Sequence, residues 1–145
     1  DGPNFLSGHL EVNNEFGGLA LSDQKYDGKI RAKRISNDFE QLNTVIGIIA
    51  TDAPLNRMQL KRMSIMCHGS ISRSIHPSHT PMDGDTIFAI STSDKSLNVS
   101  EKISKLDLTI ISSIASDTFS RACNRAIFEA KNIGGKPSWK DLFEN

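Results

Sequence analysis

The sequence predicts a mixed α/β fold with helices layered on a sheet, and three observations carry this prediction. Two short apolar segments, 44–53 and 85–93, have the β-branched composition of strands. Two longer segments, 56–75 and 107–131, repeat apolar residues at three- and four-residue steps, as amphipathic helices do. The order along the chain is strand, helix, strand, helix, which is typical of a sheet covered by helices.

Composition sets the outer limits. The chain has 145 residues, 17 of them basic and 17 acidic, so its length suits one domain and its formal net charge is zero. We expect no nucleic-acid partner and no membrane partner, because no global field attracts either one and the apolar runs are too short to span a bilayer. Cys67 and Cys123, in a chain without a secretory segment, predict free thiols and a cytoplasmic location. Because the first residue is Asp1 rather than Met, we expect a processed or truncated piece of a longer protein.

Residues 1–43 are predicted to form an irregular arm. The stretches "DGPNF", "VNNEFGG" and "YDGK" are rich in turn-forming residues, and the arm has too few apolar residues to fold alone. Only 9–12 and 18–21 are suited to pair as short strands. We expect this arm to be the least ordered part of the chain, with the α/β unit beginning at residue 44.

The first strand and helix of that unit follow from local signals. "TVIGIIATDA" is a continuous apolar run, which predicts a strand buried on both faces, and Gly47 within it indicates close approach of a neighbouring group. Asn56 and Gln59 have the spacing of a capping box, so the helix should begin there, and Pro77 should end it. One apolar stripe is expected to face the core: Leu60, Met63, Cys67, Ile71 and Ile75.

The second strand and helix complete the unit. "DTIFAISTS" predicts a strand, and we expect it to lie beside the first one in the centre of the sheet. Asp107 is the predicted N-cap of the last helix, which "NIGG" and Pro137 end. Trp139 is expected to anchor the tail. The apolar positions predicted to face inward from this helix are Ile110, Ile111, Ile114, Ala115, Ala122 and Ala126.

Thr44 stands where polar "EQLN" meets the apolar run. It can simply begin a strand, as β-branched residues often do. It can also be a nucleophile, provided that a base lies beside its hydroxyl. Cleavage of the Asn43–Thr44 bond would supply that base, because a free α-amino group with a pKa of about 7.7–8.0 accepts a proton near neutral pH. The hydroxyl can make the cut itself by attacking the Asn43 carbonyl, which gives an ester that water hydrolyses.

The longer stretch around Thr44 discriminates between these interpretations. "NTVIGIIATDAPLNRMQLKRMSIMCHGSISRSIHPSHTPMDGDTIFAIST" closely resembles the DmpA/NylC-type N-terminal-nucleophile peptidases, which include L-aminopeptidase/D-esterases, β-peptidyl aminopeptidases and nylon-oligomer hydrolases. The resemblance continues more weakly through "ASDTFSRACNRAIFEA". It implies the C-terminal portion of a layered helix–sheet–helix fold and self-cleavage between Asn43 and Thr44. Residues 1–43 would then end the family's α chain, and 44–145 would form its β-chain-like unit beginning at the nucleophile.

Two further site residues follow from the same resemblance. The loop "MDGD" places Asp83 and Asp85 where the nylon-hydrolase branch has acidic residues beside its nucleophile. Carboxylates near the new ammonium group would hold it and move protons during acyl transfer. Gly84 between them allows close approach of the backbone to a substrate. Taken alone, the loop favours a glycine-containing turn with solvated aspartates, and the match at Thr44 favours the catalytic interpretation.

No metal site and no cofactor are predicted. His76 and His79 lie near the two aspartates, but Pro77 breaks the helix that would place both imidazoles on one face, and the resemblance implies no metal. Cys67 lies on an apolar helical stripe and is predicted to be a packed thiol rather than a reactive one.

The resemblance also implies parts that this chain does not contain. Family proteins have a domain-sized N-terminal portion that supplies much of the substrate pocket and a side-chain amide for the oxyanion. The predicted partners are therefore that N-terminal portion, further copies in a homo-oligomer, and a small peptide or oligoamide substrate.

The predicted function is that of an amidohydrolase whose N-terminal threonine attacks short linear amides. Its substrates would be peptides with a free amino end, β-peptides or aminohexanoate oligomers. Two alternatives stay open. One is acyl transfer of the ornithine acetyltransferase type, in which an autocatalytic threonine precedes a comparable "ATDA" segment. The other is an inactive structural fragment.

Overall fold

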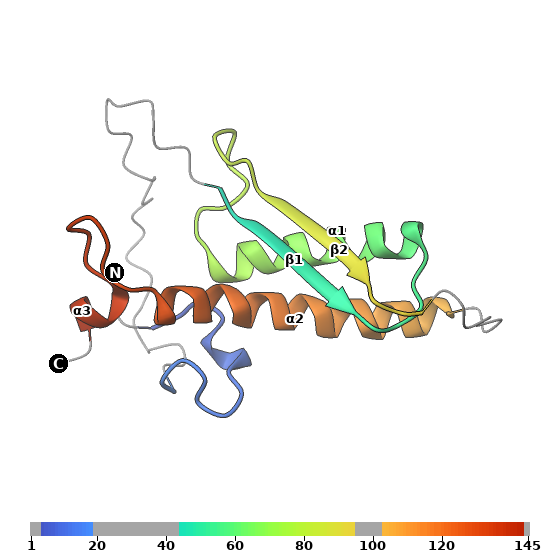
Figure 1. Cartoon of the computed structure of the whole chain (residues 1–145), viewed down its shortest axis with the longest axis horizontal. Coiled ribbons are helices and arrows are strands. Elements are labelled where there is room, and N and C mark those ends of the chain that lie inside the picture. Colours follow the sequence, from blue (N-terminus) through green and yellow to red (C-terminus); the bar gives the residue numbers. More distant parts are fainter. Residues whose placement is uncertain (1–3, 19–43, 95–102, 144–145) are drawn as a thin grey trace.

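The computed structural model describes residues 4–18, 44–94 and 103–143. Within these ranges the strand, helix, strand, helix order and the mixed α/β class are confirmed (Figure 1). No helix in the described ranges is long and apolar enough to cross a membrane. The elements are a 3₁₀ helix η1 (Gly8–Leu10), β1 (Ile46–Thr51), α1 (Arg57–Ser74), β2 (Thr86–Ser91), α2 (Lys105–Glu129) and a short α3 (Trp139–Phe143).

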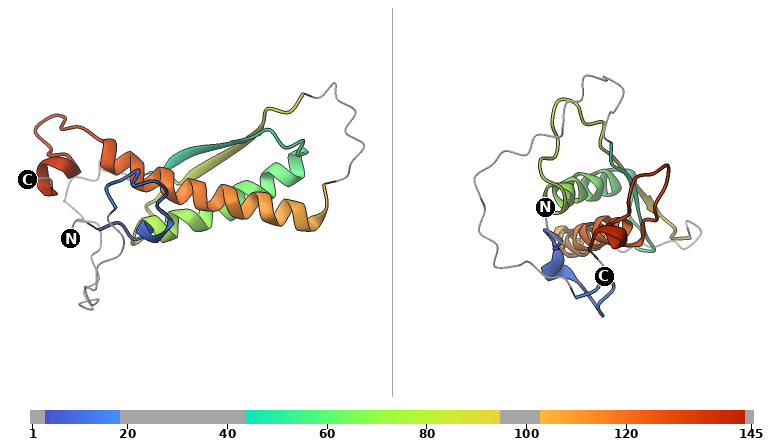
Figure 2. Two further views of the ribbon diagram at one scale, coloured as in Figure 1. Left: turned by 90° about the horizontal axis from the view of Figure 1, so that it is seen from below. Right: turned by 90° about the vertical axis from the view of Figure 1, so that its left-hand side faces the viewer.

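The two strands form a parallel pair. Ile46 lies opposite Thr86 and Thr51 lies opposite Ser91, so the register runs without a bulge. Both long helices lie on the same face of this pair, side by side (Figure 2). The described residues therefore form one sheet layer and one helix layer. The strands are neighbours as predicted, but burial of β1 on both faces was wrong for this chain, because Ile48 is 62% exposed.

Helix α1 begins and packs as its sequence predicts. The side chain of Asn56 accepts hydrogen bonds from the Met58 and Gln59 backbone N–H groups, and the Gln59 side chain accepts one from the Asn56 N–H in return. This capping box satisfies donors that the first turn would leave unpaired. The predicted stripe is confirmed, since its three central residues are fully buried and both outer ones pack against them. The buried core consists of Leu55, Met63, Cys67, Ile71, Ile87, Ala115 and Phe119.

Helix α2 differs from its prediction in its N-cap residue and in the residues that face the core. Its N-cap is Ser104, and Asp107 is the third helical residue of a capping box rather than the cap itself. Of the residues predicted to face inward, Ala115 is buried and Ile111 packs against the core. The other four are exposed: Ile110, Ile114, Ala122 and Ala126. Small polar residues occupy much of the buried face of α2 instead. The short side chain of serine leaves room for a neighbouring helix to approach more closely than isoleucine would allow.

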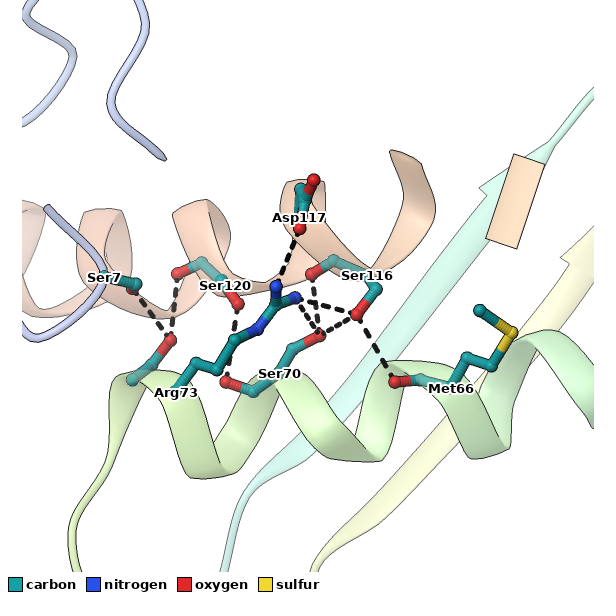
Figure 3. A network of polar contacts seen from close by, with 8 residues as sticks. Ser7, Met66, Ser70, Arg73, Ser116, Asp117 and Ser120 are labelled. Atoms are coloured by element: carbon teal, nitrogen blue, oxygen red, sulfur yellow. Dashed lines mark hydrogen bonds and ion pairs between the residues drawn. The ribbon is translucent and has the colours of Figure 1, made fainter. Parts of the chain in front are cut away.

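The serines form a hydrogen-bond network between α1 and α2 (Figure 3). Ser70 Oγ donates to the Ser116 carbonyl oxygen at 2.6 Å, and Arg73 donates from Nη2 to Ser116 Oγ at 2.8 Å. Arg73 also pairs with Asp117 at 2.9 Å. Ser70 and Ser120 are fully buried. The hydroxyls of Ser70, Ser116 and Ser120 each have a carbonyl or hydroxyl partner, whereas the buried Ser112 Oγ has none among the described residues.

The described part of the arm, residues 4–18, packs on the C-terminal end of α2. Its segment 9–12 lies in and after η1 and forms no strand, so that prediction was wrong. Arg121 binds the Glu15 carboxylate, and this ion pair holds the pKa of Glu15 below its usual value. Trp139 stacks on Phe5 with ring centroids 5.5 Å apart, so the tail anchor is confirmed.

Residues 19–43 and most of segment 18–21 lie outside the described residues. The division of the chain at residue 44 stays a prediction.

Candidate active site

Thr44 lies two residues before the first residue of β1. This end of β1 faces the loop that leads into β2. Its side chain is exposed. The backbone of Gly84 lies against it, such that a Cβ added to Gly84 would stand 3.1 Å from Thr44 Oγ1. The glycine that was expected to admit a substrate therefore admits the hydroxyl of Thr44 itself. Asn43 lies outside the described residues.

The Asp85 carboxylate is almost fully enclosed. Its side chain is 6% exposed, and Oδ1 accepts a hydrogen bond from the Val45 N–H at 2.9 Å. Its other oxygen, Oδ2, lies 3.3 Å from His79 Nδ1. Through the Val45 N–H, Asp85 is hydrogen-bonded to the backbone of the residue that follows Thr44.

Asp83 closes the loop on itself. Its Oδ2 accepts a hydrogen bond from the Thr80 N–H at 2.9 Å, and its own N–H donates to the Thr80 carbonyl at 2.9 Å. This reciprocal pair fixes the turn that carries Gly84 and Asp85 toward β2. The carboxylate is therefore held in place before any substrate arrives.

The three predicted site residues share one cavity of about 300 Å³. Its lining combines two hydroxyls and two carboxylates with three apolar side chains: Thr44, Val45, Ile71, Ile75, Ser78, Asp83 and Asp85. The residues come together because parallel strands begin at the same edge of a sheet, so the start of β1 meets the loop that enters β2. Their chemical roles stay predictions.

His79 was considered in the sequence only as half of a metal site. In the structure its ring contacts Asp85 through Nδ1 and the His68 carbonyl oxygen through Nε2, at 3.1 Å. Within the described ranges no three His, Cys, Asp or Glu side chains gather closely enough to hold a metal ion. In the sequence, the contact between His79 and Asp85 was indicated only by the position of His79 shortly before the "MDGD" loop.

Cys67 is remote from this chemistry. Its side chain is fully buried in the core, and burial raises the pKa of its thiol to about 11. A thiol that stays protonated at neutral pH is a poor nucleophile, which agrees with its prediction as a packed residue.

Comparison with known sequences assigns the chain. The sequence profile of Peptidase family S58 matches residues 4–139. An uncharacterized aminopeptidase of Mycobacterium tuberculosis is 35% identical over 107 residues, which cover 70% of this chain and 31% of that protein. A 6-aminohexanoate-oligomer endohydrolase of Paenarthrobacter ureafaciens is 32% identical over 90 residues, covering 59% and 25%.

A second uncharacterized aminopeptidase, of Mycobacterium leprae, is 30% identical over 118 residues, covering 76% of this chain and 32% of that protein. The chain therefore spans about a third of the length of the aminopeptidases that it matches. No solved structure matches it. Because the family profile covers nearly the whole chain, the protein belongs to Peptidase family S58.

Proposed function

We propose that the whole protein, of which this chain is the C-terminal portion, is a self-processing amidohydrolase with Thr44 as its nucleophile. The observation that carries the proposal is the shared cavity, where the Thr44 hydroxyl, the Gly84 backbone and two carboxylates meet. Membership of a peptidase family and similarity to proteins named aminopeptidase and 6-aminohexanoate-oligomer endohydrolase support amide hydrolysis.

Processing comes first in the proposed sequence. Thr44 Oγ attacks the Asn43 carbonyl carbon, the C–N bond to Thr44 breaks, and the acyl group moves to the oxygen as an ester. Water hydrolyses that ester, leaving a carboxylate on Asn43 and a free α-amine on Thr44. Asp85 would hold the Val45 N–H during both steps and so limit movement of the reacting peptide.

Turnover uses the newly formed amine. The amine accepts the Thr44 hydroxyl proton as the oxygen attacks the substrate amide, and the leaving amine departs with a proton. Water then hydrolyses the acyl-enzyme ester. Asp83, which lines the cavity together with Thr44, would orient the α-amine between these steps.

The N-terminal portion of the longer gene product is the proposed partner. The face of the sheet that points away from α1 and α2 is apolar, and no described residue covers it: Ile46 is 73% exposed and Phe88 is 56% exposed. Parallel strands are almost always covered on both faces, and large exposed apolar patches mark interaction surfaces. We propose that the N-terminal portion covers this face and completes the pocket.

The proposed substrates are short linear amides. The cavity beside Thr44 is small, about 300 Å³, and carries two carboxylates, which suits a chain with a free amino end. Peptides, β-peptides and aminohexanoate oligomers share that chemistry. We also propose that the processed protein forms a homo-oligomer in the cytoplasm.

Intact-mass spectrometry of the whole gene product tests the proposal. The expected result is a new chain that begins at Thr44, together with hydrolysis of at least one amide from a panel of these three types. Thr44→Ala should abolish both, whereas the matched Thr44→Ser variant keeps a hydroxyl and should keep slower cleavage. Cleavage that survives in Thr44→Ala would overturn the proposal.

A second assay separates the alternatives. Incubation with acetylornithine and glutamate would yield acetylglutamate if the protein were an acyl transferase, and we expect none. An unprocessed whole gene product without turnover would favour the structural fragment instead. The 145-residue chain alone should stay uncut and inactive.

A further inference from the structure

The ring of His79 lies between two hydrogen-bond acceptors. Nε2 is 3.1 Å from the backbone carbonyl oxygen of His68, which only accepts, so Nε2 must donate. Nδ1 is 3.3 Å from Oδ2 of Asp85, a carboxylate oxygen. The ring therefore bridges the middle of α1 and the start of β2.

Only one protonation state of the ring serves both contacts. A neutral imidazole has a single N–H, so with Nε2–H on the carbonyl it would turn a lone pair toward the carboxylate. The imidazolium ion has an N–H group on each nitrogen, so it donates to the His68 carbonyl oxygen and places positive charge 3.3 Å from the Asp85 carboxylate. The geometry thus fits a charged His79 paired with a charged Asp85.

The Asp85 carboxylate needs such a partner. Its side chain is 6% exposed, and a carboxylate removed from water is costly unless it is paired and hydrogen-bonded. The Val45 N–H donates to one oxygen, and the His79 ring nitrogen lies 3.3 Å from the other. The other titratable groups near the His79 ring are the His68 ring, whose centroid is 5.5 Å away, and Asp83 in the same loop.

The backbone of His79 has an unusual conformation at this contact. Its φ of 55° lies in the left-handed region, which few residues other than glycine adopt. Such a conformation costs free energy and persists where the surrounding contacts determine it. The ring itself is 39% exposed, so the site of the contact is reachable from solvent.

We propose that His79, as an imidazolium ion, is a positioning residue that holds Asp85 and, through the Val45 N–H, the backbone next to the Thr44 nucleophile. The inference rests on the proposed function, because positioning matters only if Thr44 reacts. His79 touches neither the hydroxyl nor the scissile bond in this role. It acts through Asp85.

Chemical rescue provides the test. His79→Gly removes the ring at a position whose left-handed φ suits glycine, so the loop should keep its shape. In the whole gene product, this variant should process the Asn43–Thr44 bond roughly 10- to 100-fold more slowly, the cost of a small misplacement of reacting groups. Added imidazole should restore a large part of the rate, and the rescue should fade as the pH rises and imidazole loses its proton.

A matched variant controls for the glycine. Asn13→Gly makes the same kind of change at φ 57°, on the exposed arm, and should leave the rate unchanged with or without imidazole. A His79→Gly variant that cleaves at the original rate, or a slow one that imidazole does not accelerate, would overturn the role of His79 while an inert Thr44→Ala still supports the proposed function. Cleavage in Thr44→Ala would overturn both.

Discussion

The two faces of the β1–β2 sheet have similar composition and opposite surroundings. On the face toward the helices, Ile87 is 7% exposed, and Ile49 packs against the core. On the other face, Ile48 is 62% exposed and Ile90 is 42% exposed. Isoleucines lie on both faces of the sheet. Apolar composition therefore does not show which face is buried in this chain and which face is open to a partner.

This contrast indicates which contacts stabilise the fold. Burial of apolar surface contributes about 25 cal/mol per Å² only when the surface leaves water. Cys67 and Ile71 on α1 and Phe119 on α2 remove the inner face from water, whereas no described residue does so for the outer face. Changes on the inner face should therefore alter stability in the isolated chain, and the same changes on the outer face should not.

The largest expected effect comes from filling the space at Gly47. A Cβ at this inner position would overlap the end of the Phe119 ring, which is 5% exposed and enclosed by the core. Gly47→Ala should lower the free energy of unfolding of the 145-residue chain by about 1–3 kcal/mol, measured by urea denaturation, because overpacking forces the ring out of place. The double variant Gly47→Ala/Phe119→Leu should recover part of that loss relative to the sum of the single changes. Strict additivity would show that the two residues do not meet.

A smaller effect should appear in the pH dependence of stability. Burial raises the pKa of Cys67 from 9.0 to about 11, so between these values the unfolded chain loses a proton that the folded chain keeps. Stability from this group is complete below pH 9 and decreases as the pH rises toward 11. Between pH 8 and pH 10 the free energy of unfolding of the unmodified chain should fall by about 1 kcal/mol more than that of the Cys67→Ala variant. Urea denaturation at each pH measures both. Parallel pH profiles would contradict burial of the thiol.

The smallest effect uses two adjacent residues that point to opposite faces. Ile49→Val removes one methylene from the inner face and should cost about 0.5–1 kcal/mol, toward the low end because the side chain is only partly buried. Ile48→Val removes the same group from the outer face and should change the free energy of unfolding by less than about 0.5 kcal/mol. If the N-terminal portion covers the outer face as proposed, Ile48→Val should become destabilising in the whole gene product. An effect that is equal in both preparations would refute that coverage.

Local sequence signals were enough to predict the main strands and helices and their order. The capping box at Asn56, the apolar stripe of α1 and the β-branched runs of both strands are local signals, and each element formed within a few residues of its prediction. The resemblance around Thr44 and "MDGD" identified which residues would gather at one site. Both successes rest on interactions between residues that are close in sequence or on motifs that can be read directly.

The buried face of α2 and the contact of His79 with Asp85 depend on packing between elements that are distant in sequence. Apolar periodicity placed Ile110 and Ile114 inward on α2, yet the close approach of α1 selected the serines at 116 and 120, since small side chains and hydrogen bonds across the interface depend on the neighbouring helix. The same holds for His79. Its contact with Asp85 depends on the left-handed turn and on the carbonyl of His68 in α1, and no pattern in the chain specifies a distance between groups that folding brings together.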